Sequence, residues 1–580
     1  MAFLPAARRP GPRLLAAAVA VAVVLAHVPA FFHRLLDGDE AIYGSIAALM
    51  NLGGRLYADG GVDNKPPGIF WVYAATFRVA GTYQMTAIHA VSLIVALATC
   101  WLLFRVGRSV YGVRAGLLAA LIYGVFTAAG NPRLLAANTE IFMMLPLTAS
   151  FLLMLRRQWL WSGALLVAAG AFRQVAAIDL LLVPLAIVLM EPQAQRLRAF
   201  GLFAGGVAGA LVAGAALLAA TGSLLGLWDW TIRTQYGYAT LNWTPALVWM
   251  RAQDSVLPFV LTAAVVWVAA VAFAWRWKRV PPAAQLIVAW LVVSIPGSLA
   301  AGHLSWHYFI QVMGPLALLA AFAIDMALNG PHRRWVASAA IAGIALPMAG
   351  WGVYDLVADP LTYDFKAPAP AHETVAAYID SHTRPQDRVF VWGVWPALYV
   401  ESDRIMASRF PGFLRGFARG SALPPNNWDT SPAVWPALEE DLTLHPPALI
   451  VDTSPANWSD FSMYPMSNYP VLAHFVAAGY HLAATVDGVA VYAPNGSLGK
   501  PGAGTFDNSD GTVTTTGSRS GALTLTGIAG RAAEWLALPT TLAGRAAGST
   551  AATRVATWDG RWDPADPTAA TRGGLWVCPT

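Results

Sequence analysis

Charged residues are scarce in this chain. Asp, Glu, Lys and Arg make up 12% of its 580 residues, about half of the ~25% found in an average globular protein. Hydrophobic residues make up 57%, so there are too few charges to cover a water-facing surface. The composition excludes a soluble enzyme, and it excludes a disordered protein because disorder requires low hydrophobicity and high charge. The chain is predicted to be an integral membrane protein.

Cysteine is equally scarce. The two cysteines, Cys100 in an apolar run and Cys578 near the C-terminus, are too few to build a disulfide framework. The pI of about 9.2 does not point to nucleic acid, because the positive residues have a topological explanation. We therefore expect no nucleic-acid partner.

Long apolar runs are what the chain has in place of charge. A transmembrane helix needs ~20 mostly apolar residues, and eleven runs approach that length. The stretch 159–190 has a second interpretation, as one broken helical pair inside the bundle. The runs are 12–32, 84–104, 114–130, 138–155, 159–173, 176–190, 198–219, 255–275, 283–301, 307–327 and 335–354.

The positions of Lys and Arg predict the orientation. Residues 1–354 carry 23 Lys and Arg against 11 Asp and Glu, whereas residues 355–580 carry 14 against 21. With a cytoplasmic N-terminus, fifteen of those 23 fall in short inner connections, as the positive-inside rule expects. The chain is thus predicted to be a multi-pass protein of the cytoplasmic (inner) membrane, with everything after residue 354 outside the cytoplasm. A signal peptide cleaved near Ala30 is the alternative interpretation of the first run.

Two outer connections, 33–83 and 220–254, are too long to be simple links. Within the first, apolar positions at helical spacing over 40–52 predict an amphipathic helix on the membrane surface. The second is rich in tryptophan, which is typical of an aromatic belt at the lipid headgroups. A lipid- or sugar-binding role is the alternative.

The outer part divides into two segments. Helical and strand-like runs alternate within 355–495, which predicts a small extracytoplasmic α/β domain. Residues 496–580 are rich in Gly, Ser, Thr and Ala, and we interpret them as a β-rich tail. The predicted architecture is therefore a polytopic α-helical membrane domain, 1–354, followed by these two outer segments.

Polar clusters at the outer ends of the runs are candidate functional sites, because charges against a membrane are costly. A carboxylate there can act as a general base toward a hydroxyl, and Lys, Arg or His can stabilise a phosphate leaving group. Acidic groups can also bind a divalent cation, with Asp39 and Glu140 as candidate ligands. Taken singly, each cluster is also typical of a polar stop or turn at a membrane interface. The clusters are 37–40 (DGDE), 63–68 (DNKPPG), 131–133 (NPR) with 138–140 (NTE), and 302–308 (GHLSWHY).

Several of these segments resemble one family. The stretches GDEAIYGSIAALM, DNKPPGIFWVYAATF and NTEIFMMLPL look like those of the GT-C glycosyltransferases of the protein O-mannosyltransferase and aminoarabinose transferase type. The segment SWHYFIQVMGPLALLAA is similar to a His-Tyr-Phe run of bacterial members, and VFVWGVWPALYVESDRIMASRF resembles their small periplasmic domain. The resemblance covers roughly residues 10–495, and residues 496–580 have no counterpart.

The resemblance implies an inverting transfer of a sugar from a polyprenyl-phosphate donor in the outer leaflet. The acceptor would be a hydroxyl of a cell-envelope glycan, glycolipid or protein. By motif position Asp39 matches the catalytic acid of the family's first loop, Glu40 its neighbour, and Lys65 the lysine that contacts the lipid phosphate. Glu140, the third candidate catalytic residue, stands where aminoarabinose transferases more often have Asp. The further candidates for binding the donor phosphate are Arg173, His307, Arg133, His303 and Tyr308.

Two other classes of protein remain as alternatives. Ten to twelve spans are common in secondary transporters, but the chain shows no two-fold repeat of spans. A non-catalytic glycan-binding membrane protein is the third interpretation. Loss of turnover on mutation of Asp39 would separate the enzyme from the binding protein.

Overall fold

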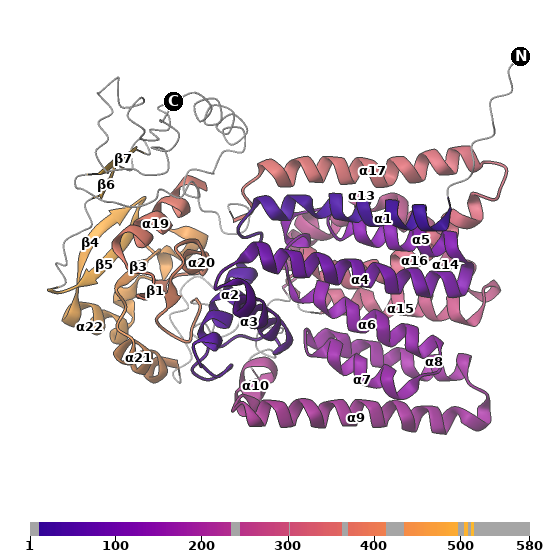
Figure 1. The fold of residues 1–580 in the computed structure, drawn as a ribbon, viewed down its shortest axis with the longest axis horizontal. Coiled ribbons are helices and arrows are strands. Elements are labelled where there is room, and N and C mark those ends of the chain that lie inside the picture. The colour runs from indigo at the N-terminus through magenta and orange to yellow at the C-terminus, as the bar shows by residue number, and fades with distance from the viewer. Residues whose placement is uncertain are drawn as a thin grey trace, which may run out of the picture.

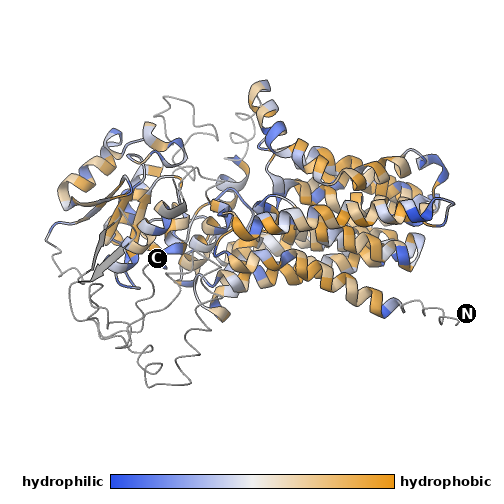
Figure 2. Ribbon diagram, turned by 90° about the horizontal axis from the view of Figure 1, so that it is seen from above, coloured by the Kyte–Doolittle hydropathy of each residue, from blue (hydrophilic) through white to orange (hydrophobic). Residues whose placement is uncertain are grey.

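The computed structural model of the chain describes residues 11–233, 244–300, 302–361, 369–412, 434–496, 504–507 and 512–515. A bundle of helices with roughly aligned axes forms one part, and an α/β unit lies against one end of it (Figure 1). Apolar residues dominate the bundle, and hydrophilic residues gather at its two ends (Figure 2).

The bundle is built from the predicted apolar runs. Helix α16 lies at its centre and is buried along most of its length. Gly112 separates two neighbouring helices. Its φ of 92° is a conformation that glycine adopts without strain, and it ends α4 at Tyr111. Helix α5 then turns back alongside α4. The bundle helices are α1 (Pro12–His27), α4 (Met85–Tyr111), α5 (Val113–Phe126), α6 (Thr139–Leu155), α7 (Trp159–Gly170), α8 (Leu182–Met190), α9 (Arg196–Ala220), α12 (Pro245–Arg251), α13 (Leu257–Thr262), α14 (Ala264–Ala274), α15 (Pro282–Leu299), α16 (Ile310–Ala327) and α17 (Arg333–Val357).

Six helices of the described residues are long and apolar enough to cross a membrane. A seventh candidate is the bent pair Pro245–Thr262 and Ala264–Ala274, which meet at 75°. Four of the eleven predicted spans fall on shorter apolar helices, so the count of eleven is not confirmed. Two of these four lie in 159–190, where α7 is followed by the 3-10 helix η3 (Gln174–Leu181) and by α8. The four shorter helices are Val113–Phe126, Thr139–Leu155, Trp159–Gly170 and Gln174–Met190.

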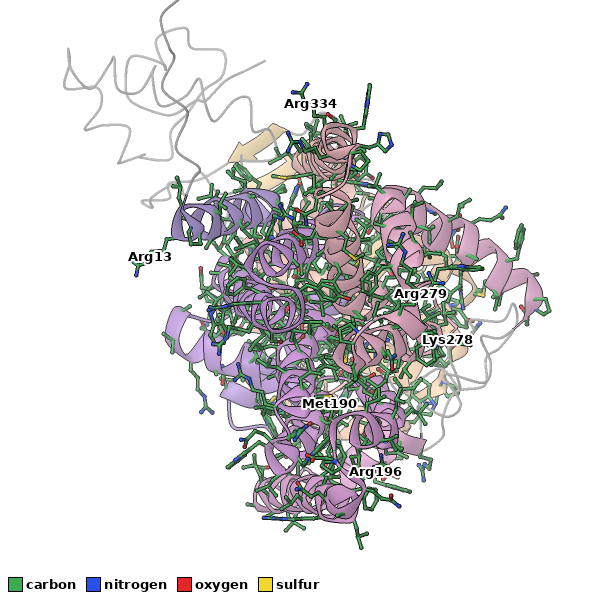
Figure 3. All side chains as sticks on the ribbon, turned by 90° about the vertical axis from the view of Figure 1, so that its right-hand side faces the viewer. Arg13, Met190, Arg196, Lys278, Arg279 and Arg334 are labelled. Carbon is green, nitrogen blue, oxygen red and sulfur yellow. The ribbon has the colours of Figure 1, made fainter. Side chains whose placement is uncertain are left out.

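Basic residues gather at the end of the bundle farthest from the α/β unit. Figure 3 looks at that end, and its labelled residues include Arg13, Arg196, Lys278, Arg279 and Arg334. All five were predicted to lie at the inner face. Their clustering at one end agrees with the prediction that Lys and Arg fall in connections on one side of the membrane. Which side of the membrane each end faces stays a prediction.

Two short helices, α2 (Gly38–Asn51) and α3 (Gly68–Ala80), lie between the bundle and the α/β unit (Figure 1). The predicted surface helix over 40–52 is α2, and its placement on the membrane surface stays a prediction. Nearly every residue from Gly38 to Leu49 is buried. A Cβ on Gly44 would lie 3.6 Å from Phe77 of α3 and 3.7 Å from Val400 of the α/β unit. The α/β unit therefore covers part of α2.

The α/β unit contains a five-stranded sheet in the order β2-β1-β3-β5-β4. Strand β1 pairs in parallel with β2 and β3, whereas β5 is antiparallel to β3 and β4. Asp487 and Gly488, both with positive φ, form the tight turn between β4 and β5. The strands are β1 (Arg388–Trp392), β2 (Ile405–Met406), β3 (Leu449–Asp452), β4 (Tyr480–Val486) and β5 (Val489–Pro494), and the helices are α19 (Ala369–His382), α20 (Ala397–Glu401), α21 (Val434–Leu444) and α22 (Pro470–Gly479).

The predicted β-rich tail is described over two short segments. Strands β6 (Gly504–Asp507) and β7 (Thr512–Thr515) form an antiparallel pair. The rest of 497–580 lies outside the described residues.

Candidate active site

The predicted polar clusters meet where the bundle joins the α/β unit. The N-terminus of α2, the loop before α3, the N-terminus of α6, the break between α7 and η3, and the 3-10 helix η8 (Trp306–Phe309) each contribute side chains. These elements are separated by up to 270 positions in the sequence. The fold therefore assembles one site from clusters that the sequence presents separately.

Asp39 and Lys65 form the centre of this site. The Lys65 ammonium group lies 3.3 Å from Oδ2 of Asp39, and both side chains are only partly buried. Tyr43, one helical turn after Asp39, donates its hydroxyl to the same oxygen at 3.3 Å. Burial and the nearby carboxylates raise the pKa of Tyr43 well above its usual range, so its hydroxyl keeps its proton and remains a donor.

The loop that carries Lys65 is fixed by its own sequence. The Asp63 carboxylate accepts the backbone N–H of Lys65 at 3.0 Å, and Tyr57 donates its hydroxyl to the Lys65 carbonyl at 2.7 Å. After the two prolines, the N–H of Gly68 donates to the carbonyl of Ala171 at 2.8 Å. A Cβ on Gly68 would lie 2.7 Å from that carbonyl oxygen. The loop thus packs directly against the break after α7.

Arg173, Glu140 and Tyr308 form a buried group beside this centre. The Arg173 guanidinium pairs with the Glu140 carboxylate and lies over the ring of Tyr308, 3.8 Å from its centroid. Thr139 donates its hydroxyl to the other Glu140 oxygen at 2.8 Å. Tyr308 also interacts electrostatically with Lys65 and Asp39. Arg173 and Tyr308, both predicted to bind phosphate, therefore lie close to the pair at the centre.

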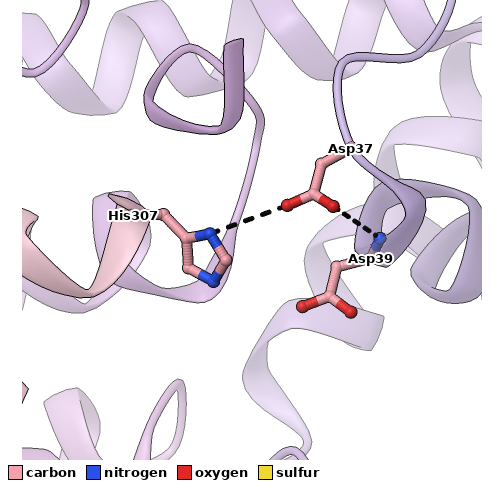
Figure 4. A group of neighbouring side chains, drawn as sticks. All are labelled: Asp37, Asp39 and His307. Atoms are coloured by element: carbon pink, nitrogen blue, oxygen red, sulfur yellow. Dashed lines mark hydrogen bonds and ion pairs between the residues drawn. The ribbon is translucent and has the colours of Figure 1, made fainter. Parts of the chain in front are cut away.

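His307 connects the two groups. Its Nδ1 lies 3.6 Å from Oδ2 of Asp37, and its Nε2 lies 3.9 Å from Oε1 of Glu140. Asp37 is the N-cap of α2, accepting the N–H of Asp39 at 3.3 Å, and its other oxygen accepts the Asn138 amide at 2.8 Å. Figure 4 shows Asp37, Asp39 and His307 converging.

The same three residues fit a metal ion. One ligand atom from each of Asp37, Asp39 and His307 lies within 4.8 Å of the others. Two carboxylates and an imidazole suit a divalent transition metal. The buried Nδ1 of His307 has no described hydrogen-bond donor or acceptor at bonding distance, as expected for a nitrogen available to a ligand. Glu140 is one of the two candidate metal ligands predicted from the sequence. Its carboxylate instead forms an ion pair with Arg173.

Glu40 is placed differently from Asp39. It is fully buried, and its carboxylate accepts three hydrogen bonds, from His89 at 3.1 Å and from the backbone N–H groups of Ala137 and Leu36 at 2.6 and 2.8 Å. These bonds connect the start of α2 to α4 and to the loop before α6. Glu40 therefore connects three elements of the site, while the catalytic role predicted for it stays a prediction.

Arg133 and His303 lie at the same end of the bundle. Arg133, in the 3-10 helix η2 (Pro132–Leu134), interacts electrostatically with His307. His303 lies in the segment between α15 and η8, which Arg251 holds by donating to the carbonyl of Gly302 at 2.8 Å. Their contact with a donor phosphate stays a prediction.

A cavity of about 520 Å³ adjoins the site. Trp306, which precedes His307, and Asn131, which precedes η2, form part of its wall, so the cavity shares two elements with the site. Its lining combines aromatic rings with two polar side chains. The lining residues are Asn131, Asp254, Pro258, Trp306, Pro347, Gly350, Trp351 and Tyr354.

Several residues of the site were absent from the predicted set, among them Asp37, Asn138 and His89. Asp37 and Asn138 lie inside clusters that the sequence singled out, and the Asp-x-Asp spacing at a helix start is the signal that could have identified Asp37. His89 lies within the apolar run of α4, where an ionisable residue is itself a signal of a role. Its partner Glu40 lies 49 positions away.

Comparison with known proteins concerns the fold and one part of the chain. Residues 64–219 match the family model of dolichyl-phosphate-mannose-protein mannosyltransferase. The structure is similar to that of ArnT from Cupriavidus metallidurans bound to undecaprenyl phosphate, with a TM-score of 0.57, 16% identity, and coverage of 84% of this chain and 98% of ArnT. The apo state of ArnT gives a TM-score of 0.52 with 14% identity over 83% and 97%. No curated protein sequence matches.

These comparisons define the class of protein. The chain has the fold of the GT-C glycosyltransferases, which confirms the superfamily predicted from its motifs. Within that superfamily, the family match covers the Lys65 loop, Glu140 and Arg173, but it begins after Asp39.

Proposed function

We propose that this protein transfers a sugar from a polyprenyl-phosphate donor to a hydroxyl of a cell-envelope glycan, glycolipid or protein, with inversion, at the outer face of the membrane. The observation that carries the proposal is the 3.3 Å ion pair of Asp39 and Lys65. It joins a candidate base to a candidate phosphate ligand. The mannosyltransferase family match and the undecaprenyl phosphate bound to ArnT support the class of donor.

The donor phosphate is held by the positive side of the site. Lys65, Arg173 and the hydroxyl of Tyr308 surround one region, and charge-assisted hydrogen bonds to a phosphate are the strong ones. Arg173 is buried, and Glu140 offsets its charge while the site is empty. Binding a phosphate here replaces ion pairs inside the protein with ion pairs to the ligand.

Asp39 serves as the general base. The acceptor oxygen forms a bond to the anomeric carbon, and the bond from that carbon to the phosphate oxygen breaks. The acceptor proton moves to Asp39, and polyprenyl phosphate leaves with the bonding electron pair, stabilised by Lys65 and Arg173. Inversion places the base and the leaving group on opposite faces of the sugar, so Lys65 exchanges its contact with Asp39 for one with the phosphate when the donor binds.

Asp37, Asp39 and His307 are the residues that would hold a divalent metal. Such an ion would supply a Lewis acid beside the phosphate. It would also occupy an Asp39 oxygen, so metal binding and the role of Asp39 as a base are linked. Zn²⁺, Mn²⁺ and Mg²⁺ are titrated into the metal-stripped protein. Calorimetry then measures metal binding, and turnover shows whether Asp39 acts as a metal ligand or as a base.

In this proposal the acceptor binds in the cavity next to Trp306. Trp351 and Tyr354 offer aromatic faces to the apolar face of a sugar ring, and Asp254 and Asn131 offer groups that bind hydroxyls. An acyl chain alone would leave the Asp254 carboxylate facing hydrocarbon, which is costly. The polar groups therefore favour a hydroxyl-bearing acceptor.

The function is tested with purified protein, a synthetic polyprenyl-phosphate sugar and a crude cell-envelope acceptor. We expect acceptor-dependent release of polyprenyl phosphate. Donor binding without any release would instead favour a glycan-binding protein. Movement of the intact donor across proteoliposomes would favour a transporter.

A further inference from the structure

A short segment of the α/β unit contacts the Lys65 loop. This segment follows β2 and runs from Ala407 to Phe410. The N–H of Ala407 donates to the carbonyl of Val389 at 2.8 Å, so the segment continues the edge of the sheet. The Arg409 carbonyl accepts the N–H of Val62 at 3.0 Å, three residues before Lys65.

Asp441 of α21 holds Arg409 in place. One of its oxygens accepts the backbone N–H of Arg409 at 2.7 Å, and both oxygens accept N–H groups of the guanidinium at 2.6 to 3.0 Å. Asp441 is 6% exposed, so water competes little for this bidentate pair. Glu440 also binds the guanidinium, at 2.9 Å, but its side chain is 60% exposed.

Val62 belongs to the core of the α/β unit. It is 1% exposed and packs in the same cluster as Phe410 and Trp392, although it comes from the first outer loop of the membrane part. Trp230, from the second outer loop, packs edge-on against Phe410 with ring centroids 6.4 Å apart. Among the described residues, a backbone hydrogen bond of Val62 and its buried side chain attach the loop to the α/β unit.

The bundle holds the other side of the same loop. Gln174 donates its side-chain amide to the carbonyl of Asn64 at 2.9 Å. Val62 is thus attached to the α/β unit and Asn64 to the bundle, and Lys65 follows both in the chain. A shift of the Arg409 segment would move Val62 and with it Asp63, whose carboxylate accepts the N–H of Lys65 at 3.0 Å.

We propose that the α/β unit is a positioning element of the active site, and that Asp441, acting through Arg409 and Val62, sets the place of the Lys65 ammonium group. Asp441 contacts neither donor nor acceptor in this proposal. The proposal rests on the proposed function, because it assigns Asp441 an effect on the donor phosphate through Lys65.

The test is a double-mutant cycle with the full-length protein. Asp441→Asn keeps the size of the side chain and removes the charge that binds Arg409. We expect a loss of about 10- to 100-fold in kcat/KM for the polyprenyl-phosphate sugar, since a small displacement of a binding group costs that much. In a Lys65→Ala background the same change should alter kcat/KM by less than about twofold, because coupled residues are non-additive.

The controls separate this proposal from others. Glu440→Gln removes the exposed partner of the same guanidinium and should leave kcat/KM near the wild-type value. If the losses in kcat/KM of the two single mutants multiply in the double mutant, Asp441 is merely structural and the proposal is overturned. No loss in Lys65→Ala alone would contradict the role of Lys65 in the proposed function instead. If Asp441→Asn does not fold, Arg409→Lys keeps the charge without the bidentate geometry and enters the same cycle.

Discussion

The carboxylate of Asp39 lies 3.3 Å from the ammonium group of Lys65, although 26 positions separate the two residues. Tyr43 contacts both: its hydroxyl donates to Asp39, and its ring lies 5.8 Å from the Lys65 nitrogen. The ion pair thus joins a carboxylate that can accept a proton to a cation that can bind a phosphate. The pairing also keeps the Lys65 charge in place before a phosphate arrives.

Asp39 and Glu40 should respond differently to neutral substitution. We expect Asp39→Asn to lower turnover by at least ~100-fold without changing the melting temperature, because it removes the base. Glu40→Gln leaves a buried hydrogen-bond donor without its acceptor and should cost ~1–3 kcal/mol of stability, with turnover per folded molecule near normal. Thermal unfolding and turnover on the same preparations check both. A larger turnover loss in Glu40→Gln would mean that the base is assigned to the wrong carboxylate.

Lys65 should matter for the donor and not for the fold. Lys65→Ala is expected to weaken use of the polyprenyl-phosphate donor by ~1.5–3 kcal/mol, the range for hydrogen bonds to charged groups. Lys278→Ala, at the far end of the bundle (Figure 3), is the matched control. Unchanged donor affinity and rate in Lys65→Ala would remove this residue from the site.

The motifs of the site could be predicted because each is a local polar cluster at the end of an apolar run. The resemblance then gave Asp39 and Lys65 complementary roles, and the structure brings them together. The partners of Glu40 could not be predicted, since no local pattern connects it to His89 in another helix. The burial of α2 was missed for a similar reason: its second face is covered by Val400, more than 350 residues later.

Gly68 tests whether the close packing of the Lys65 loop is needed. A Cβ there would lie 2.7 Å from the Ala171 carbonyl oxygen, so Gly68→Ala must push the loop away from the break after α7. We expect a loss of ~1–3 kcal/mol of stability, as for overpacking, together with weaker donor binding. Gly170→Ala is the control, because its Cβ would meet no atom within 4 Å. Equal effects of the two substitutions would contradict the role given to Gly68.

The contact between the segment that follows α17 and the α/β unit should depend on pH. Burial opposes the charge of His372, but hydrogen bonds to Asp359 at 3.0 Å and Glu401 at 2.8 Å outweigh it and raise the pKa of His372 to about 10. Because folding raises this pKa, protonated His372 stabilises the folded protein. The stabilisation is complete below the unfolded pKa of ~6.5 and is lost as the pH rises through the folded pKa. The stability difference between wild type and His372→Gln should therefore shrink between pH 6.5 and 10. A constant difference across this window would contradict the ion pairs.

The cavity beside Trp306 should bind the acceptor. The ring of Trp351 lies 5.4 Å from that of Trp306, and its N–H donates to the Thr262 hydroxyl at 3.2 Å, so the ring is held in place. Trp351→Ala removes one aromatic wall of the cavity, and we expect the KM for the acceptor to rise by about tenfold, the equivalent of ~1.4 kcal/mol. The KM for the donor should stay unchanged.

Trp335→Ala is the control for this prediction, because Trp335 lies on the same helix at its far end and is 79% exposed. Asp254→Asn adds a second probe, since it keeps the shape of the cavity and removes the charge that would bind a hydroxyl. If both cavity substitutions raised the KM for the donor and left that for the acceptor unchanged, the cavity would belong to the polyprenyl chain. The acceptor would then have to approach Asp39 from the side of the α/β unit.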